Sequence, residues 1–274
     1  FSSQVDNRAD VMIVGVPASQ TSLSPTSAHE TPQAIRQALQ RYSTAHSDPR
    51  VNLEKISLCD AGDVTSPDGD EAGAIARLKS IGAKSSLLIA LGGDNSITYS
   101  GVQATGATGL ITLDAHYDLR DGVSNGSPVR RLIEAGLSGK KVVQIGIADF
   151  SNSTAYAKRA KEFGITVIPR SELRSKRVEE IWARALSIAG DKVYVDFDMD
   201  VCDRSVVPAC PAAAPGGMSA DELRQFAFLA GTSPSVIGAD ITEIDATKDS
   251  ADERTVRLAS LVVLEMAAGF STRL

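Results

Sequence analysis

Two apolar, strand-like segments of the chain end in alternating residues of the kinds that bind hard metal ions. One covers residues 109–118 and reads Gly-Leu-Ile-Thr-Leu-Asp-Ala-His-Tyr-Asp, and the other covers residues 192–200. The candidate ligands are Asp114, His116, Asp118, Asp198 and Asp200. Side chains two apart on a strand point to the same face, with Cβ atoms roughly 6 to 7 Å apart, so such pairs can share ions. A mostly oxygen donor set suits Mn²⁺ or Mg²⁺ better than metals that prefer sulfur.

A simpler interpretation is that these aspartates bond nearby loops and that His116 is an ordinary core histidine. Gathering this many acidic groups without a cation would leave carboxylates repelling one another at low dielectric. The occurrence of both clusters in one chain therefore favours a metal centre.

Composition limits the other possibilities. A chain of 274 residues, 43% hydrophobic and without a linker or charge run, is expected to form a single domain, residues 1–274. The net charge of −6 argues against a nucleic-acid partner or an anionic membrane surface. The 3 cysteines show no C-x-x-C spacing, so neither a disulfide framework nor a thiolate zinc site is indicated. No run reaches about 18 apolar residues, and residues 1–6 lack a secretion-signal pattern, so we expect a cytoplasmic protein.

Short Val/Ile/Leu-rich runs alternate with amphipathic stretches, as in repeated β-α units around a parallel sheet. We predict strands at residues 11–16, 53–59, 86–91, 109–114, 141–147, 165–168, 192–198 and 236–241. We predict helices at residues 32–43, 71–82, 95–104, 127–136, 153–163, 177–189, 220–230 and 253–268. Periodicity alone does not separate a TIM barrel from an open sheet, but in both folds ligands emerge at the carboxyl ends of the strands.

Three further segments lead to the same edge. Residues 92–96, Gly-Gly-Asp-Asn-Ser, form a tight strand-to-helix turn that delivers Asn95, although Asp94 or Asn95 could simply cap the helix. Glu243 follows the last predicted strand and could bind a cationic amidine or guanidine, or be solvated there. Arg120, Arg130 and Arg131 lie near the loop that contains Asn125. They could hold substrate carboxylates, or they could be solvated residues on a helix face.

Taken together, residues 92–96, Asp114-Ala-His-Tyr-Asp118 and Asp198-Met-Asp200 resemble the metal signatures of the arginase/agmatinase/formimidoylglutamase (ureohydrolase) family, and the resemblance runs from Val11 to the C-terminal helix. It implies a three-layer α/β fold with an open, mainly parallel eight-stranded sheet and helices on both faces, usually assembled as a trimer or hexamer. It also implies two Mn²⁺ ions per subunit. The ligands carried over are Asp114, His116, Asp118, Asp198 and Asp200, with Asn95 as a sixth.

This chain departs from the family pattern at two positions. Most members have His where this chain has Asn95, and an asparagine oxygen is a weaker but acceptable ligand for Mn²⁺. Arginases have His at the loop of Asn125, so the loss of a possible proton shuttle argues against an arginase. These changes, with residues 150–156 and 207–217, resemble the Bacillus type of formimidoylglutamase. Asp196, where relatives usually have a small polar residue, could support the ligands from one layer below or act as an extra ligand.

The implied activity is manganese-dependent hydrolysis of N-formimidoyl-L-glutamate to L-glutamate and formamide in histidine degradation. In it, Asp118 would carry the proton, Glu243 would orient the formimino group, and Arg120, Asn125 and Arg130 would contact the rest of the substrate. Two alternatives stay open. The chain could hydrolyse another guanidino or amidino acid, as a guanidinobutyrase or agmatinase does, or it could be a metal-poor, non-catalytic binding subunit.

Overall fold

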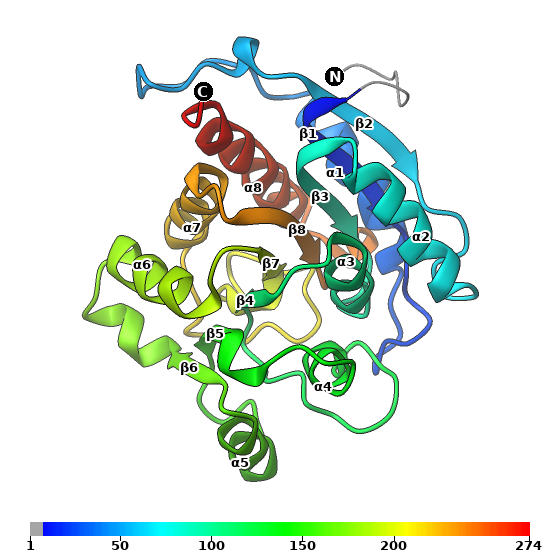
Figure 1. Ribbon diagram of the computed structural model, residues 1–274, viewed down its shortest axis with the longest axis vertical. Helices are drawn as coiled ribbons and strands as arrows, with labels where there is room; N and C mark the ends of the chain where they lie inside the picture. The colour runs from blue at the N-terminus through cyan, green and yellow to red at the C-terminus, as the bar shows by residue number, and fades with distance from the viewer. Residues whose placement is uncertain (1–7) are drawn as a thin grey trace.

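The computed structural model describes residues 8–274, and its strands form one sheet in which all neighbouring strands are parallel (Figure 1). The strands are β1 (Ala9–Val16), β2 (Leu58–Asp63), β3 (Ser85–Gly92), β4 (Gly109–Leu113), β5 (Val142–Ile147), β6 (Thr166–Pro169), β7 (Val193–Asp198) and β8 (Val236–Thr242). Their order across the sheet is β2-β1-β3-β8-β7-β4-β5-β6. Because β2 and β6 lie at opposite edges of this order, the sheet is open, and the barrel alternative is wrong.

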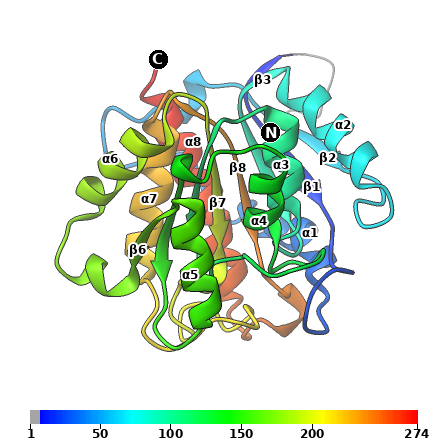
Figure 2. The same cartoon turned by 60° about the horizontal axis from the view of Figure 1, so that its bottom comes forward.

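Helices cover both faces of the sheet and complete the three layers (Figures 1 and 2). The helices are α1 (Thr31–Leu39), α2 (Glu71–Gly82), α3 (Ile97–Thr105), α4 (Pro128–Glu134), α5 (Thr154–Phe163), α6 (Val178–Ala189), α7 (Ala220–Thr232) and α8 (Arg254–Ser271). Strand β3 shows how the sequence creates two faces, because Leu87, Ile89 and Leu91 join the core under α1, α6, α7 and α8. Leu88 and Ala90 alternate with them and pack under α2 and α3 instead. The predicted three-layer architecture is confirmed.

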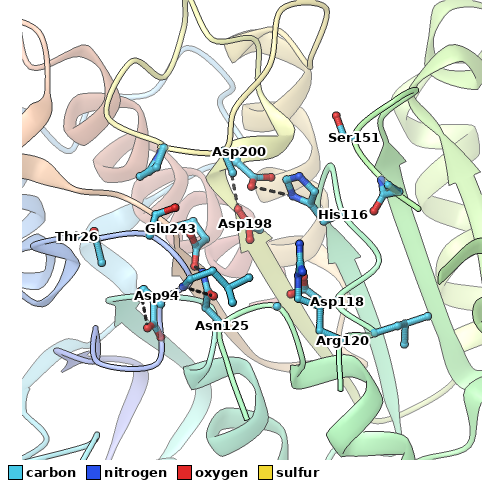
Figure 3. A pocket seen from close by; sticks show the side chains of 18 of the residues that line it. Thr26, Asp94, His116, Asp118, Arg120, Asn125, Ser151, Asp198, Asp200 and Glu243 are labelled. Atoms are coloured by element: carbon cyan, nitrogen blue, oxygen red, sulfur yellow. Dashed lines mark hydrogen bonds and ion pairs between the residues drawn. The ribbon is translucent and has the colours of Figure 1, made fainter. Parts of the chain in front are cut away.

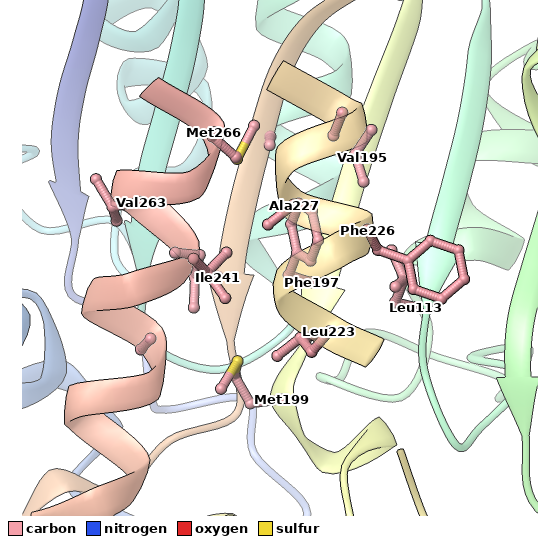
Figure 4. Close-up of a cluster of buried hydrophobic side chains, with 14 of the residues drawn as sticks. Leu113, Val195, Phe197, Met199, Leu223, Phe226, Ala227, Ile241, Val263 and Met266 are labelled. Carbon is pink, nitrogen blue, oxygen red and sulfur yellow. The ribbon is translucent and has the colours of Figure 1, made fainter. Parts of the chain in front are cut away.

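The face under α7 and α8 holds the largest apolar cluster, which Figure 4 shows around Phe226, Ile241 and Met266. Helices α7 and α8 approach closely because a glycine lies at the contact: a Cβ on Gly231 would stand 2.1 Å from the Met266 carbonyl oxygen. This packing fixes β8 and β7 from behind, so their carboxyl ends are rigid supports for the residues that follow.

The predicted element boundaries need few corrections. The strand predicted at residues 53–59 is wrong in its first half, because Leu53–Lys55 forms a 3-10 turn in which the Asn52 side chain accepts a hydrogen bond from the Glu54 N–H. Strand pairing begins at Leu58, opposite Val11. Helix α1 ends at Leu39 rather than residue 43. The turn bond from the Arg41 N–H to the Ala38 carbonyl oxygen tightens the chain there.

Within residues 8–274, no helix has both the length and the apolar character that crossing a membrane requires. The sequence predicts no secretion signal in residues 1–6. Residues 1–7 lie outside the described part of the chain.

Candidate metal centre and pocket

The candidate residues meet because β3, β8, β7 and β4 are consecutive in the sheet. In a parallel sheet the carboxyl ends of neighbouring strands share one edge, so the segments that follow them converge. Asn95 follows β3, Asp114 follows β4, Asp198 ends β7, and Glu243 follows β8. Sequence separations of more than 100 residues are thereby reduced to hydrogen-bonding distances, as between the Asn95 N–H and Glu243 Oε1, 2.8 Å apart.

The five acidic and imidazole candidates form two overlapping groups, each with ligand atoms within 4.8 Å of one another. One group contains Asp114, His116 and Asp200, and the other contains Asp114, Asp118 and Asp198. His116 Nδ1 lies 3.0 Å from Asp200 Oδ2 and 3.5 Å from Asp114 Oδ1, and Figure 3 shows the imidazole turned toward Asp200. Asp114 belongs to both groups, which is the position that a residue bridging two ions would occupy.

Burial and mutual repulsion shift the pKa values of this cluster. Burial raises the pKa of Asp114 to about 6, against the lowering effect of His116. Burial raises the pKa of Asp118 and of Asp198 well above the usual range, and the charge of Asp114 adds to both shifts. Burial lowers the pKa of His116, but the charges of Asp200 and Asp114 outweigh it and raise that pKa to about 12. The cluster thus has more negative charge than its surroundings balance.

The hydrogen bonding of the cluster also indicates that its donor atoms suit hard divalent cations. Asp114 is fully buried, and its Oδ2 has no hydrogen-bond partner among the described residues. A buried carboxylate oxygen left without a donor is costly, and a cation removes that cost. Carboxylate oxygens with one imidazole are the ligands that Mn²⁺ accepts readily.

Asn95 lies against this cluster but presents its amide nitrogen to it. Asn95 Nδ2 donates to Asp118 Oδ2 over 2.6 Å. The amide oxygen lies on the other side, where it accepts from the hydroxyls of Thr98, at 2.6 Å, and Thr242, at 3.3 Å. An asparagine ligand would have to offer its oxygen to the ion, which requires a half-turn of the amide.

Glu243 is held at the pocket by backbone and side-chain donors. Its Oε1 accepts from the Asn95 N–H and, over 2.9 Å, from Asn125 Nδ2. Asn125 Oδ1 accepts from the Leu23 N–H, so both ends of the Asn125 amide are engaged within the protein. Burial raises the pKa of Glu243 to about 7, against the lowering effect of Asn125.

The backbone at two of these residues is strained. Asp118 and Glu243 have φ values of 53° and 63°, in the left-handed region that residues other than glycine rarely adopt. Such conformations cost roughly 1–3 kcal/mol each and persist where the surrounding structure enforces them. Here the Asp118 carbonyl accepts from the Arg130 N–H, and the Glu243 N–H donates to the Gly93 carbonyl.

Four residues of the cluster line a cavity of about 420 Å³, namely His116, Asp118, Asp198 and Asp200. Its wall also includes Arg120, Asn125, Tyr156 and Glu243. The Arg120 guanidinium lies 5.7 Å from the centre of the Tyr156 ring and has no ion-pair partner among the described residues. An unpaired guanidinium on a cavity wall is suited to an anionic ligand.

The structure does not bring Arg130 to the cavity. Its buried guanidinium donates to the carbonyl oxygens of Arg120 and Gly122 and pairs with Glu134, so it holds the loop behind the pocket. Its expected contact with substrate is therefore replaced by a structural role, because Nε and Nη2 donate to loop carbonyl oxygens and Nη1 pairs with Glu134. Arg131 is also engaged elsewhere, in a bidentate pair with Glu71 at 2.8 and 2.7 Å.

Sequence reasoning missed the segment that covers the opposite wall, which includes Ser22, Leu23, Ser24 and Thr26. It is fastened by Asp94, whose Oδ2 accepts from the Ser22 hydroxyl over 2.7 Å. The available signal was its position directly after the first strand, at the carboxyl edge of the sheet.

The fold and this site together match the arginase family, whose sequence model covers residues 9–269, and the chain belongs to that family. It is 38% identical to the formimidoylglutamase of Halalkalibacterium halodurans, over 94% of this chain and 86% of that protein. It is 34% identical to the formimidoylglutamase of Bacillus subtilis, with the same coverage of 94% and 86%.

Solved structures give the same result. The crystal structure of formimidoylglutamase from Bacillus subtilis has a TM-score of 0.91 at 32% identity and covers 98% of this chain and 90% of that one. The Trypanosoma cruzi formiminoglutamase, solved with Mn2+2, has a TM-score of 0.90 at 26% identity and covers 97% of this chain and 95% of that one.

Proposed function

We propose that this protein is a manganese-dependent hydrolase that converts N-formimidoyl-L-glutamate and water into L-glutamate and formamide, a step of histidine degradation. One observation carries the proposal: the metal-type cluster, Glu243 and the unpaired Arg120 line a single cavity. A cation-binding floor, a carboxylate and a guanidinium match a substrate that has an amidine at one end and carboxylates at the other. The similarity to formimidoylglutamases over most of the chain supports the same assignment.

The residues proposed to hold two Mn²⁺ ions are Asn95, Asp114, His116, Asp118, Asp198 and Asp200. When bound, these ions supply Lewis acidity, which lowers the pKa of water toward neutral pH. Imidazole and carboxylates bind metal in their deprotonated forms, so this cluster would release protons as it takes up the ions.

The chain's own residues would position the substrate and move the proton. Because Glu243 Oε1 is engaged with Asn95 and Asn125, Oε2 is the oxygen left to accept from the cationic formimino N–H groups. Asp118 would use the carboxylate oxygen that does not bind metal to take a proton from the attacking water and return it to the leaving amine.

The test is turnover by purified protein reconstituted with Mn²⁺, with glutamate and formamide both measured. Arginine, agmatine and guanidinobutyrate serve as competing substrates, assayed through urea. We expect formimidoylglutamate to give the highest kcat/KM by far. Faster turnover of any guanidino compound would replace the substrate assignment. Binding of fewer than two Mn²⁺ ions, together with no turnover of any amidine, would favour the metal-poor, non-catalytic alternative.

We further propose that residues 1–274 act as a single domain in a cytoplasmic homo-oligomer, a trimer or hexamer. The single domain is supported by the one sheet that joins all strands between residues 9 and 242. The cytoplasmic location is supported by the buried free thiols of Cys202 and Cys210, which suit a reducing compartment. Light scattering after size-exclusion chromatography would give the oligomeric state.

A further inference from the structure

A row of buried polar side chains lies one layer below the candidate ligands. Thr112 on β4, Asp196 on β7 and Asp240 on β8 are register partners, so they point to the same face of the sheet. Each is fully buried. Two residues further along the same strands stand Asp114, Asp198 and Thr242, which places this row directly beneath the cluster.

The hydrogen bonds of this row are incomplete as the structure has them. Both carboxylate oxygens of Asp240, Oδ2 of Asp196 and the hydroxyl of Thr112 lack a well-aligned partner among the described residues. Yet Asp240 interacts with the hydroxyls of Thr98 and Tyr194, and Thr242 Oγ1 lies 3.4 Å from Asp196 Oδ1. Buried acceptors without donors are uncommon and require a physical explanation.

Two of the hydroxyls near these carboxylates point at Asn95 instead. A threonine hydroxyl has one proton, and Thr98 donates it to Asn95 Oδ1 rather than to Asp240. Thr242 stands between two acceptors at nearly equal distance, Asn95 Oδ1 at 3.3 Å and Asp196 Oδ1 at 3.4 Å. The direction of the Asn95 amide therefore decides whether these hydroxyls donate hydrogen bonds to the buried carboxylates.

We propose that Asp196 and Asp240, acting through the hydroxyls of Thr98 and Thr242, are positioning residues that stabilise the Asn95 amide with its oxygen toward Asp118. In that orientation Asn95 Nδ2 donates to the two threonine oxygens. The two hydroxyls then donate hydrogen bonds to Asp240 and Asp196, and the amide oxygen is available to a cation. The amide then has partners on both sides and Asp240 gains a donor, whereas Oδ1 cannot face a cation while both hydroxyls use it as an acceptor.

This inference rests on the proposed manganese site, and its consequence is a metal affinity that depends on residues which touch no metal. Replacing a hydroxyl by a methyl group of the same shape removes the acceptor for Nδ2. The loss of one such hydrogen bond corresponds to roughly 5- to 10-fold weaker binding of the ion next to Asp118.

The experiment is Mn²⁺ titration followed by electron paramagnetic resonance of free and bound ion. Thr98→Val and Thr242→Val should each weaken the second binding step by about 5- to 10-fold. Thr98→Ser should restore wild-type affinity, because it keeps the hydroxyl. Thr105→Val is the matched control: it lies on the same helix, and its hydroxyl bonds the Gly101 carbonyl rather than Asn95, so it should change the affinity less than twofold.

Two further variants separate positioning from simple structural support. Asp196→Val removes a buried carboxylate, so thermal stability should be unchanged or higher while Mn²⁺ affinity falls. In an Asn95→Ala background, adding Thr98→Val should have almost no further effect on the affinity. The inference is overturned if Thr98→Val acts no more strongly than Thr105→Val, or if its effect persists without Asn95. A wild-type protein that binds fewer than two Mn²⁺ ions would overturn the proposed function as well.

Discussion

Arg120 is the residue whose replacement tests the substrate assignment most directly. It is exposed on the cavity wall and has no ion-pair partner among residues 8–274, and Tyr156 stacks against its guanidinium. A bidentate contact between a guanidinium and a substrate carboxylate contributes about 1.5–3 kcal/mol. Each 1.36 kcal/mol is about tenfold in rate, so Arg120→Ala should reduce kcat/KM for formimidoylglutamate roughly 10- to 100-fold. Solvent exposure favours the lower end of that range.

Arg130 provides a contrasting variant ten residues along the chain. Its guanidinium bonds Arg120 O over 2.5 Å and is buried, so Arg130→Ala leaves carbonyl groups without donors and should lower the melting temperature. Arg120→Ala gives up only a surface stacking contact of about 0.5–1 kcal/mol and should leave the melting temperature nearly unchanged. Arg120→Lys keeps the charge but loses the fork geometry, so it should recover part of the activity.

The assay is steady-state kinetics of each variant with its Mn²⁺ content measured, using formimidoylglutamate and an alkylformamidine without carboxylates. The effect of Arg120→Ala should fall mainly on KM and should disappear for the uncharged-chain substrate. An equal loss with both substrates would show that Arg120 serves the pocket's structure rather than the carboxylates. A change below about twofold with formimidoylglutamate would show that its carboxylates are held elsewhere.

Three other outcomes follow from the site and its surroundings. Because burial raises the pKa of Glu243 to about 7 and only its ionised form attracts a cation, kcat/KM should rise as pH passes through about 7, and Glu243→Gln should flatten that rise in a pH-rate profile. Asn95→His offers a stronger donor than an amide oxygen, so Mn²⁺ titration should show a tighter second ion; unchanged affinity would argue against Asn95 as a ligand. Burial raises the pKa of Asp245, but Lys248, Thr247 and the Ser27 N–H lower it to about 2 from 3.8. Its stabilising effect, roughly 2 kcal/mol, is present above about pH 4 and lost as pH falls toward 2, so acid unfolding curves of the wild type and Asp245→Asn should converge there.

The sequence was sufficient for the parts of this site that depend on local spacing. Alternation along one strand places Asp198 above Asp196 on the same face whatever the rest of the chain does. The apolar run before Asp114, His116 and Asp118 correctly placed them at a strand end. The alternation expected to align them does not apply, because β4 ends at Leu113. The three-layer fold was also predictable, because strands such as β1 and β3 have apolar residues on both faces and amphipathic stretches follow most strands.

Boundaries and arginine roles were less predictable because they depend on competing partners. The first half of the strand predicted at residues 53–59 became a turn because a single side chain, Asn52, bonds the backbone there. Arg120 and Arg130 are equally plausible in sequence, and only the path of the loop sends one guanidinium into the cavity and the other behind it.

By itself, then, the sequence determined which residue types follow the strand ends. It also determined which face is shared by residues within a strand, such as Asp196 and Asp198, since this follows from the two-residue repeat of a strand. The tertiary structure alone decided which strands are neighbours. Insertion of β8 between β3 and β7 places Glu243 beside Asn95 and Asp240 beside Asp196. That order depends on how the helices pack on the two faces, a long-range balance of buried surface that no local pattern records.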